Sequence, residues 1–181
     1  MMIVLFDPTI YDNLKVVLEG HLYDMDAERK IRIVGREDLI DIAGMGRTFR
    51  MKFVLRDGRE RCKTSIMLCS GLTDFAGELR GIHAVGERPG AKLEMQLEMP
   101  AELSEKRRAV HDYVSGLWGE DWLISHERLT ELSVESDPST YDGSYRVKMI
   151  SSRKIDESHI DDMEALLEHL LQNAIFINDI E

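Results

Sequence analysis

The stretch LEMQLEM, residues 93–99, alternates apolar and polar side chains at every position. Successive side chains of a β-strand point to opposite faces, so this pattern predicts a strand with one face in a core and the other in water. A strand of a doubly wound parallel sheet is buried on both faces and is instead a continuous apolar run. Residues 93–99 therefore favour an antiparallel sheet that is covered on one face only.

The rest of the chain adds helices and hairpins to this strand. Strands are expected at 2–6, 30–34, 48–56, 62–68, 74–87, 91–99, 127–135 and 144–151. Helices are expected after Asp7-Pro8, at 101–119 and after Ser158, with one or two helical turns within 36–46. The sequence therefore predicts an α+β fold: a mixed, mostly antiparallel sheet with about three helices packed on it. We expect a single domain over residues 1–181, with a possible sub-division near 99–102.

Composition indicates an ordinary globular protein. Of the 181 residues, 43% are apolar and 31% are charged, and the formal net charge is −11. The opening MMIVLFDP is too short for a secretion signal and lacks a positive leader, and no run approaches the roughly 18 apolar residues of a membrane span. We expect a cytoplasmic protein that binds neither membranes nor nucleic acid, because the acidic chain would repel the phosphate backbone.

The two cysteines agree with a reducing compartment. Cys62 and Cys69 are seven residues apart, so on one strand they point to opposite faces and cannot bridge each other. Two cysteines are also too few for a disulfide framework or a four-thiolate zinc site. We interpret both as reduced structural thiols.

One short segment concentrates positive charge. RTFRMKFVLRDGRERCKTS, residues 47–65, carries seven Lys or Arg and two acids. Asp57-Gly58 predicts a two-residue hairpin turn, which sets Arg56 opposite Arg59 and Lys52 opposite Lys63. Alternation then places six cations on one face of the hairpin: Arg50, Lys52, Arg56, Arg59, Arg61 and Lys63. These six residues are the candidate binding residues.

Three explanations remain open for this basic face. It is a solvated surface, as most charge runs are; it meets an acidic partner; or it binds an anionic ligand. An acidic partner exists within the chain, because residues 155–181 contain eight acids and no Lys or Arg. That segment could meet the hairpin within the fold or across a dimer.

No motif predicts a metal site or a catalytic centre. HIDDMEALLEH, residues 159–169, offers at most one pair of ligands at one-turn spacing, and HLYDMDAE, residues 21–28, lacks the glycine and distal glutamate of a calcium loop. There is no G-x-S-x-G elbow and no phosphate-binding glycine loop. His111 and His126 are interpreted as surface or hydrogen-bonded histidines. We expect no metal and no cofactor.

The leading functional hypothesis is a non-enzymatic cytoplasmic binding protein, and a homodimer. Its basic hairpin face would bind an acidic partner or an anionic ligand. The alternative is an enzyme that acts on a small phosphate- or carboxylate-bearing substrate. A deep pocket beside the hairpin with a histidine or carboxylate inside it would favour the alternative, and a flat, solvated basic face would count against it.

Overall fold

The computed structural model describes residues 9–56, 59–81, 88–130 and 143–180. The expected strand at 2–6, the Asp7-Pro8 helix start and the Asp57-Gly58 turn lie outside these ranges. The helices are α1 (Thr9–Ala27), α2 (Leu72–Arg80), α3 (Arg107–Trp118) and α4 (Met163–Asp179), with 3₁₀-helices η1 (Ala101–Lys106) and η2 (Glu157–Asp162). The strands are β1 (Ile31–Asp41), β2 (Gly46–Leu55), β3 (Lys63–Ser70), β4 (Lys92–Pro100), β5 (Trp122–Thr130) and β6 (Gly143–Ser151).

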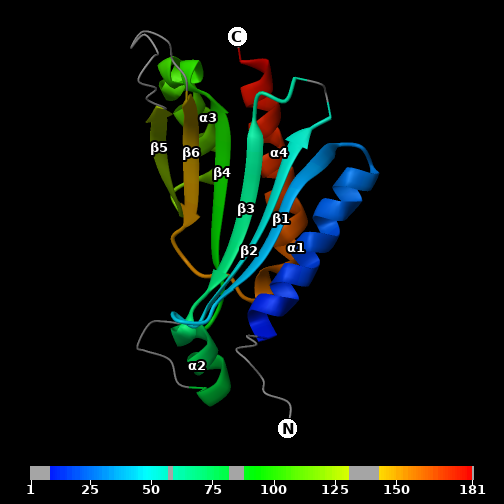
Figure 1. The fold of residues 1–181 in the computed structure, drawn as a ribbon, viewed down its shortest axis with the longest axis vertical. Coiled ribbons are helices and arrows are strands. Elements are labelled where there is room, and N and C mark those ends of the chain that lie inside the picture. The colour runs from blue at the N-terminus through cyan, green and yellow to red at the C-terminus, as the bar shows by residue number, and fades with distance from the viewer. Residues whose placement is uncertain (1–8, 57–58, 82–87, 131–142, 181) are drawn as a thin grey trace.

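The six strands form one sheet in the order β1-β2-β3-β4-β6-β5 (Figure 1). Every pair of neighbouring strands is antiparallel. The predicted α+β class is confirmed, and the sheet of the described residues is entirely antiparallel where a mixed, mostly antiparallel sheet was expected. The described residues contain four α-helices, where about three were expected.

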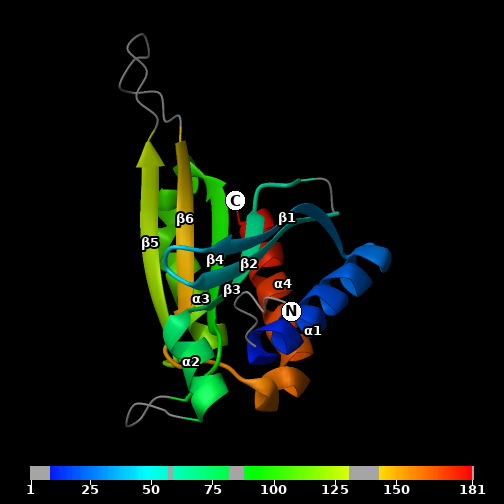
Figure 2. The ribbon, with the colours of Figure 1, turned by 60° about the horizontal axis from the view of Figure 1, so that its bottom comes forward.

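The core lies between one face of the sheet and three helices. On that face, alternate residues of the four inner strands are fully or almost fully buried, as the pattern at 93–99 predicts. They pack against buried side chains of α1, α3 and α4. The layer of helices behind the strands is visible in Figure 1, and α2 lies apart from it, beyond one end of the strands (Figures 1 and 2).

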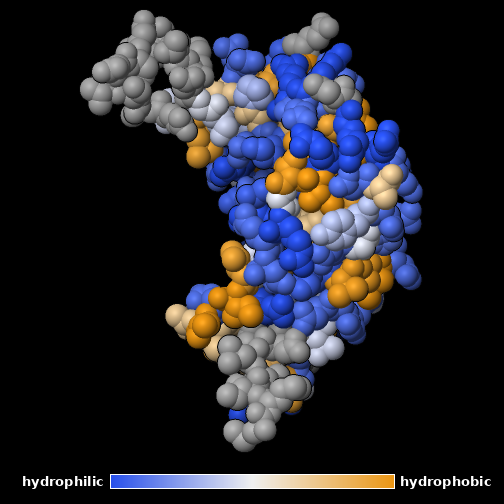
Figure 3. Space-filling model, turned by 45° about the vertical axis from the view of Figure 1, so that its right-hand side comes forward, coloured by the Kyte–Doolittle hydropathy of each residue, from blue (hydrophilic) through white to orange (hydrophobic). Residues whose placement is uncertain are grey.

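The opposite face of the sheet, called here the outer face, carries mostly polar side chains. On β4 its residues are Lys92, Glu94, Gln96 and Glu98, and β6 adds Arg146 and Lys148 beside them. The surface is hollowed on one side in Figure 3, where hydrophilic residues line most of the hollow and hydrophobic residues gather at its lower end. This distribution is typical of a sheet with a single covered face.

The prediction of helical turns within 36–46 is wrong, because β1 extends into this stretch. The strand runs through Asp41, with a bulge between Ile33 and Gly35 that shifts its register against β2. Beyond the bulge, Asp38 lies opposite the buried Phe49 and forms an ion pair with Lys15 of α1. A charged residue thus occupies an inward position, which hides the alternation that marks a half-buried strand.

The prediction of a strand over 74–87 is wrong for its first part, which belongs to the helix α2. Residues 82–87 lie outside the described ranges. The helix begins after Gly71, whose backbone N–H donates to the Asp74 carboxylate at 3.0 Å. It ends at Gly81, which adopts a left-handed conformation with φ of 61°. Asp at the third position and Gly after the last turn are helix-end signals that outweigh the weak alternation of this stretch.

The last two predicted helices form with small changes. Residues 101–119 fold as η1 followed by α3. The C-terminal helical segment begins with η2, which is capped by Asp156 rather than Ser158, with Asp156 accepting the Ser158 N–H at 3.0 Å. The α-helix α4 itself begins later than expected, at Met163. Across the residues described, no helix is both long enough and apolar enough to cross a bilayer.

Candidate functional site

The basic hairpin does not form in the predicted register. Lys52 lies opposite Ser65, not Lys63, and β2 and β3 end at Leu55 and begin at Lys63. The two strands are therefore joined by a longer connection than a two-residue turn. Because the register differs by two residues, Arg50, Lys52 and Lys63 still point to the outer face, but Arg59 and Arg61 belong to the connection.

Arg50 and Lys52 both pair with a carboxylate of the neighbouring edge strand. Glu37 of β1 lies 2.9 Å from Arg50 Nη1 and 3.0 Å from Lys52 Nζ. The side-chain hydrogen bond from Lys52 is the largest cause of the lowered pKa of Glu37, and Arg50 adds to it. Lys63, the next cation on this face, lies opposite Glu98 of β4.

Arg56, at the start of the β2–β3 connection, forms hydrogen bonds to the end of α1 and the start of β1. Its Nε donates to the Ile31 carbonyl oxygen at 2.7 Å, and its Nη2 lies 2.5 Å from Asp26. Asp26 is on α1, so the segment HLYDMDAE is helical here and does not form a ligand loop. The hydrogen bond from Arg56 is the largest cause of the lowered pKa of Asp26.

Arg59 and Arg61 meet the C-terminal end of α4. Arg61 Nη1 donates to the Ile180 carbonyl oxygen at 2.9 Å, and Arg59 Nη1 donates to the Asn178 carbonyl oxygen at 3.3 Å. Arg59 also lies 3.2 Å from Asp179. Carbonyl groups at a helix C-terminus lack intrahelical donors and carry partial negative charge, so cations stabilise them. The acidic C-terminal segment is thus an intramolecular partner of the connection.

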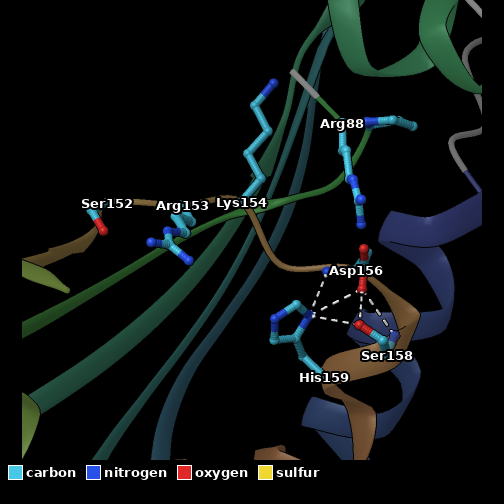
Figure 4. Close-up of a pocket in the computed structure, with 8 residues that line it drawn as sticks. Arg88, Ser152, Arg153, Lys154, Asp156, Ser158 and His159 are labelled. Carbon is cyan, nitrogen blue, oxygen red and sulfur yellow. Dashed lines mark hydrogen bonds and ion pairs between the residues drawn. The ribbon is translucent and has the colours of Figure 1, made fainter. Parts of the chain in front are cut away.

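A second group of cations lines a cavity of about 530 Å³. The cavity lies beside residues 152–159, which follow β6 and lead through η2 to α4. We call it the cationic pocket, and Figure 4 shows its residues. Its lining consists of Arg88, Pro89, Ser152, Arg153, Lys154, Asp156, Ser158 and His159. Cationic and hydroxyl side chains around one cavity are the groups that bind carboxylate and phosphate oxygens.

A close backbone approach forms the pocket. Ala91 and Ile155 exchange two backbone hydrogen bonds, of 2.8 and 2.9 Å. A Cβ on Gly90 would lie 2.6 Å from the Ile155 carbonyl oxygen, so only glycine allows this approach. The bridge holds the Arg88 side of the pocket beside residues 152–159.

The positive charge in the pocket is only partly compensated. Lys154 pairs with Asp74 of α2, its Nζ lying 2.6 Å from the carboxylate. In Figure 4, Arg88 reaches toward Asp156 while Lys154 points away from it. Arg88 and Arg153 are exposed, and among the described residues neither has an ion pair with a carboxylate. The two guanidinium groups remain able to bind an added anion.

Asp156, Ser158 and His159 form a capping cluster and not a nucleophilic triad. Asp156 Oδ1 accepts from Ser158 Oγ at 2.5 Å and lies 3.0 Å from His159 Nδ1, and Ser158 Oγ lies 3.3 Å from the same Nδ1. A triad needs the acid on one ring nitrogen and the hydroxyl on the other. Here both contact Nδ1, and the hydrogen bond from Ser158 is the largest cause of the lowered pKa of Asp156.

A smaller, more apolar cavity of about 260 Å³ adjoins the cationic pocket. The two cavities share Ser152, Arg153, Lys154 and His159. The rest of the smaller cavity is lined by four apolar residues, Trp122, Ile155, Met163 and Leu166, and by Ser151, Asp121 and Asp162. Together the two cavities offer cationic groups at one end and a mostly apolar surface at the other.

A chain of hydrogen bonds outside the pocket joins α3 to the sheet. His111 Nδ1 lies 2.9 Å from His126 Nε2, and His126 Nδ1 lies 2.6 Å from the Tyr145 hydroxyl. Burial is the largest cause of the raised pKa of Tyr145, about 12, and of the lowered pKa of His126. Both histidines are hydrogen-bonded, as the sequence interpretation expects.

The structure contains two free cysteines and, within the described ranges, no cluster of three or more metal-ligating side chains. Cys62 is fully buried, and burial raises the pKa of its thiol to about 12. A thiol with so high a pKa is a poor nucleophile at neutral pH.

Sequence reasoning missed the cationic pocket. Its residues come from two segments that lie far apart in the chain, 88–89 and 152–159. The available signal was the run Ser152-Arg153-Lys154 between a strand and a helix, which is shorter than the basic hairpin. Comparison of the chain with protein-family models, curated proteins and solved structures finds no match.

Proposed function

We propose that the chain is a non-enzymatic binding protein for a small anionic molecule, and that the cationic pocket is its binding site. The ligand class is a carboxylate or phosphate with an apolar portion. The anionic group would lie against Arg88 and Arg153, and the apolar portion would enter the adjoining cavity beside Trp122. The supporting observation is that, within the described ranges, the two guanidinium groups have no ion pair with a carboxylate and lie at a cavity that adjoins a mostly apolar one.

Electrostatics also support this site. In a chain of net charge −11, a local group of cations creates a positive potential that an acidic surface does not otherwise offer to anions. The hairpin cations lie mostly in ion pairs or on helix carbonyl groups, so an anion there would have to displace existing partners. Binding of an acidic partner by the hairpin stays a prediction.

The test is a titration with three probes, octanoate, inorganic phosphate and octanol, followed by calorimetry and by NMR shifts of pocket residues. We expect octanoate to bind more tightly than phosphate, and octanol to bind weakly or not at all. Replacement of Arg153 or Arg88 by Gln should weaken octanoate binding about tenfold, the loss of one charge-assisted hydrogen bond of ~1.5 kcal/mol.

The matched control is Arg108→Gln, at an exposed arginine on α3 that does not line either cavity. Its affinity for octanoate should equal that of the wild type. If octanoate and phosphate both fail to bind, or if R108Q loses as much affinity as R153Q, the pocket is not the site.

An enzyme that acts on a small anionic substrate remains the second candidate. The observation that favours it is His159, which lines both cavities and whose Nδ1 is held by Asp156. The ring nitrogen Nε2 would be the acid–base group. Incubation of the protein with a ligand that it binds, followed by mass spectrometry of the ligand, distinguishes the two candidates. An unchanged ligand mass supports binding, and a mass change that is lost in H159Q supports catalysis.

We place either activity in the cytoplasm, which the two free thiols support.

A further inference from the structure

β5 is an edge of the sheet. Its only neighbouring strand within the described residues is β6, and the two pair without a bulge over nine positions, from Trp122↔Ser151 to Thr130↔Gly143. The other side of such a strand presents a row of backbone N–H and C=O groups that can pair with another strand. β5 therefore has the regular geometry that strand addition requires.

The opposite edge of the sheet carries a bulge and two inward-pointing charges that prevent strand addition, whereas β5 has no bulge and one charge, Arg128, on its inner face. β1 is interrupted by the bulge at Ile33 and Gly35 and turns the charged Arg36 and Asp38 inward. A bulge and inward-pointing charges are known protections of edge strands. β5, with the sequence WLISHERLT, has no bulge, no proline and no lysine.

Two exposed leucines lie symmetrically on β5. Leu123 is 66% exposed and Leu129 is 42% exposed, and both point to the outer face of the sheet. Each is three residues from His126, so an antiparallel pairing of two β5 strands centred on His126 sets Leu123 of one copy opposite Leu129 of the other. By symmetry this contact forms twice. Opposed apolar side chains stabilise an antiparallel pair.

Neighbouring registers are less favourable. Centring on Ser125 sets Leu123 opposite Glu127, and centring on Glu127 sets two Glu127 carboxylates directly against each other, which is destabilising. In the register centred on His126, Glu127 lies opposite Ser125. Its carboxylate is also 3.7 Å from Arg146 of its own chain, which reduces repulsion between the two copies.

We propose that this chain forms a homodimer through antiparallel pairing of two β5 strands, with His126 at the twofold axis. The partner is a second copy because the strand is complementary to itself in one register. Pairing would join two six-stranded sheets into one continuous sheet and cover Leu123 and Leu129.

Light scattering coupled to size exclusion, over a series of protein concentrations, tests the dimer. The wild-type chain should elute as a dimer, and L123K/L129K should raise the dimer dissociation constant by at least about tenfold, since it replaces both leucine contacts by charges. Val16→Lys is the control, because Val16 is 65% exposed on α1 and lies outside the interface. A wild-type monomer at every concentration, or L123K/L129K dimers as stable as V16K dimers, would overturn the proposal.

Cross-linking tests the register independently of the affinity. In the register centred on His126, the double variant S125C/E127C should form a disulfide-linked dimer under mild oxidation, while S125C alone and E127C alone should not. A linked dimer of S125C alone indicates the register centred on Ser125, and one of E127C alone indicates the register centred on Glu127. Either of these results contradicts the register proposed here. The wild-type chain controls for linkage through Cys62 and Cys69.

Discussion

At the scale of single residues, His126 is the group whose protonation the fold most clearly opposes. Its ring is hydrogen-bonded on both nitrogens, to His111 and to Tyr145. Burial is the largest cause of its lowered pKa, and the nearby charges of His111 and Arg107 add to it. A proton on His126 would place a positive charge in this partly buried position near Arg107.

This lowered pKa predicts loss of stability in weak acid. The folded-state pKa of His126 lies below the unfolded value of 6.5, so the unfolded chain binds the proton more readily. The contribution of His126 to stability is complete above pH 6.5 and is lost as the pH falls through the folded-state pKa. Urea unfolding of the wild type and of H126Q between pH 7.5 and pH 5 should show a weaker pH dependence for the variant. An equal pH dependence of the free energy of unfolding in the wild type and H126Q would contradict the lowered pKa of His126.

At the scale of elements, the cations of the β2–β3 connection serve the C-terminus of α4. Arg59 and Arg61 bind carbonyl oxygens of the last turn, and the buried Asn178 accepts the Cys62 backbone N–H at 3.1 Å. These contacts link a connection of two strands to a helix that lies more than 100 residues further along the chain. They offset the like-charge repulsion that so many neighbouring cations would otherwise create.

Removal of these cations should loosen the end of α4. We expect R59Q/R61Q to lower the free energy of unfolding by ~1 kcal/mol, because exposed contacts at a helix terminus contribute at most this much. Hydrogen exchange should accelerate for the amides of the last turn of α4 and stay unchanged in its first turn. The control is Lys63→Gln, at an exposed cation of the same segment on β3. Equal destabilisation by K63Q would show that the helix end is not the relevant contact.

At the scale of the whole molecule, ion pairs on the two faces of the sheet differ in burial. On the inner face, Arg47 is 11% exposed and lies 3.0 Å from Asp12 of α1 and 3.3 Å from Asp38 of β1. Its guanidinium group also lies over the Tyr11 ring, 4.9 Å from the centroid. These contacts close α1 onto the sheet. On the outer face, Arg50 is 31% exposed and pairs with Glu37.

The same substitution should therefore have different effects on the two faces. R47Q leaves Asp12 and Asp38 without this cation in a mostly buried place, so we expect a loss of ~2–4 kcal/mol in the free energy of unfolding. R50Q removes a partly exposed pair and should cost at most ~1 kcal/mol. Equilibrium unfolding in urea measures both. Similar losses for the two variants would mean that burial of the Arg47 cluster does not decide its contribution.

Secondary structure could be predicted from the sequence wherever the spacing of apolar side chains alone decides it. The alternating run at 93–99 and the amphipathic pattern of residues 101–119 form β4 and α3 as expected. The prediction was right for the first part of β1 but failed for its second part, from Arg36 to Asp41, and for α2. In β1, inward charges replace apolar residues, and in α2 the capping residues are stronger signals than the side-chain pattern.

The sequence by itself determined the antiparallel α+β class, since alternation of side chains depends only on local backbone geometry. Only the tertiary structure decided which groups the positively charged side chains contact. Arg59 and Arg61 lie on a helix end, and Arg88 and Arg153 gather at one cavity, because the packing of distant segments sets these distances. Electrostatic interactions act through space, and residues 88 and 153 become neighbours only when the Gly90–Ile155 approach has formed.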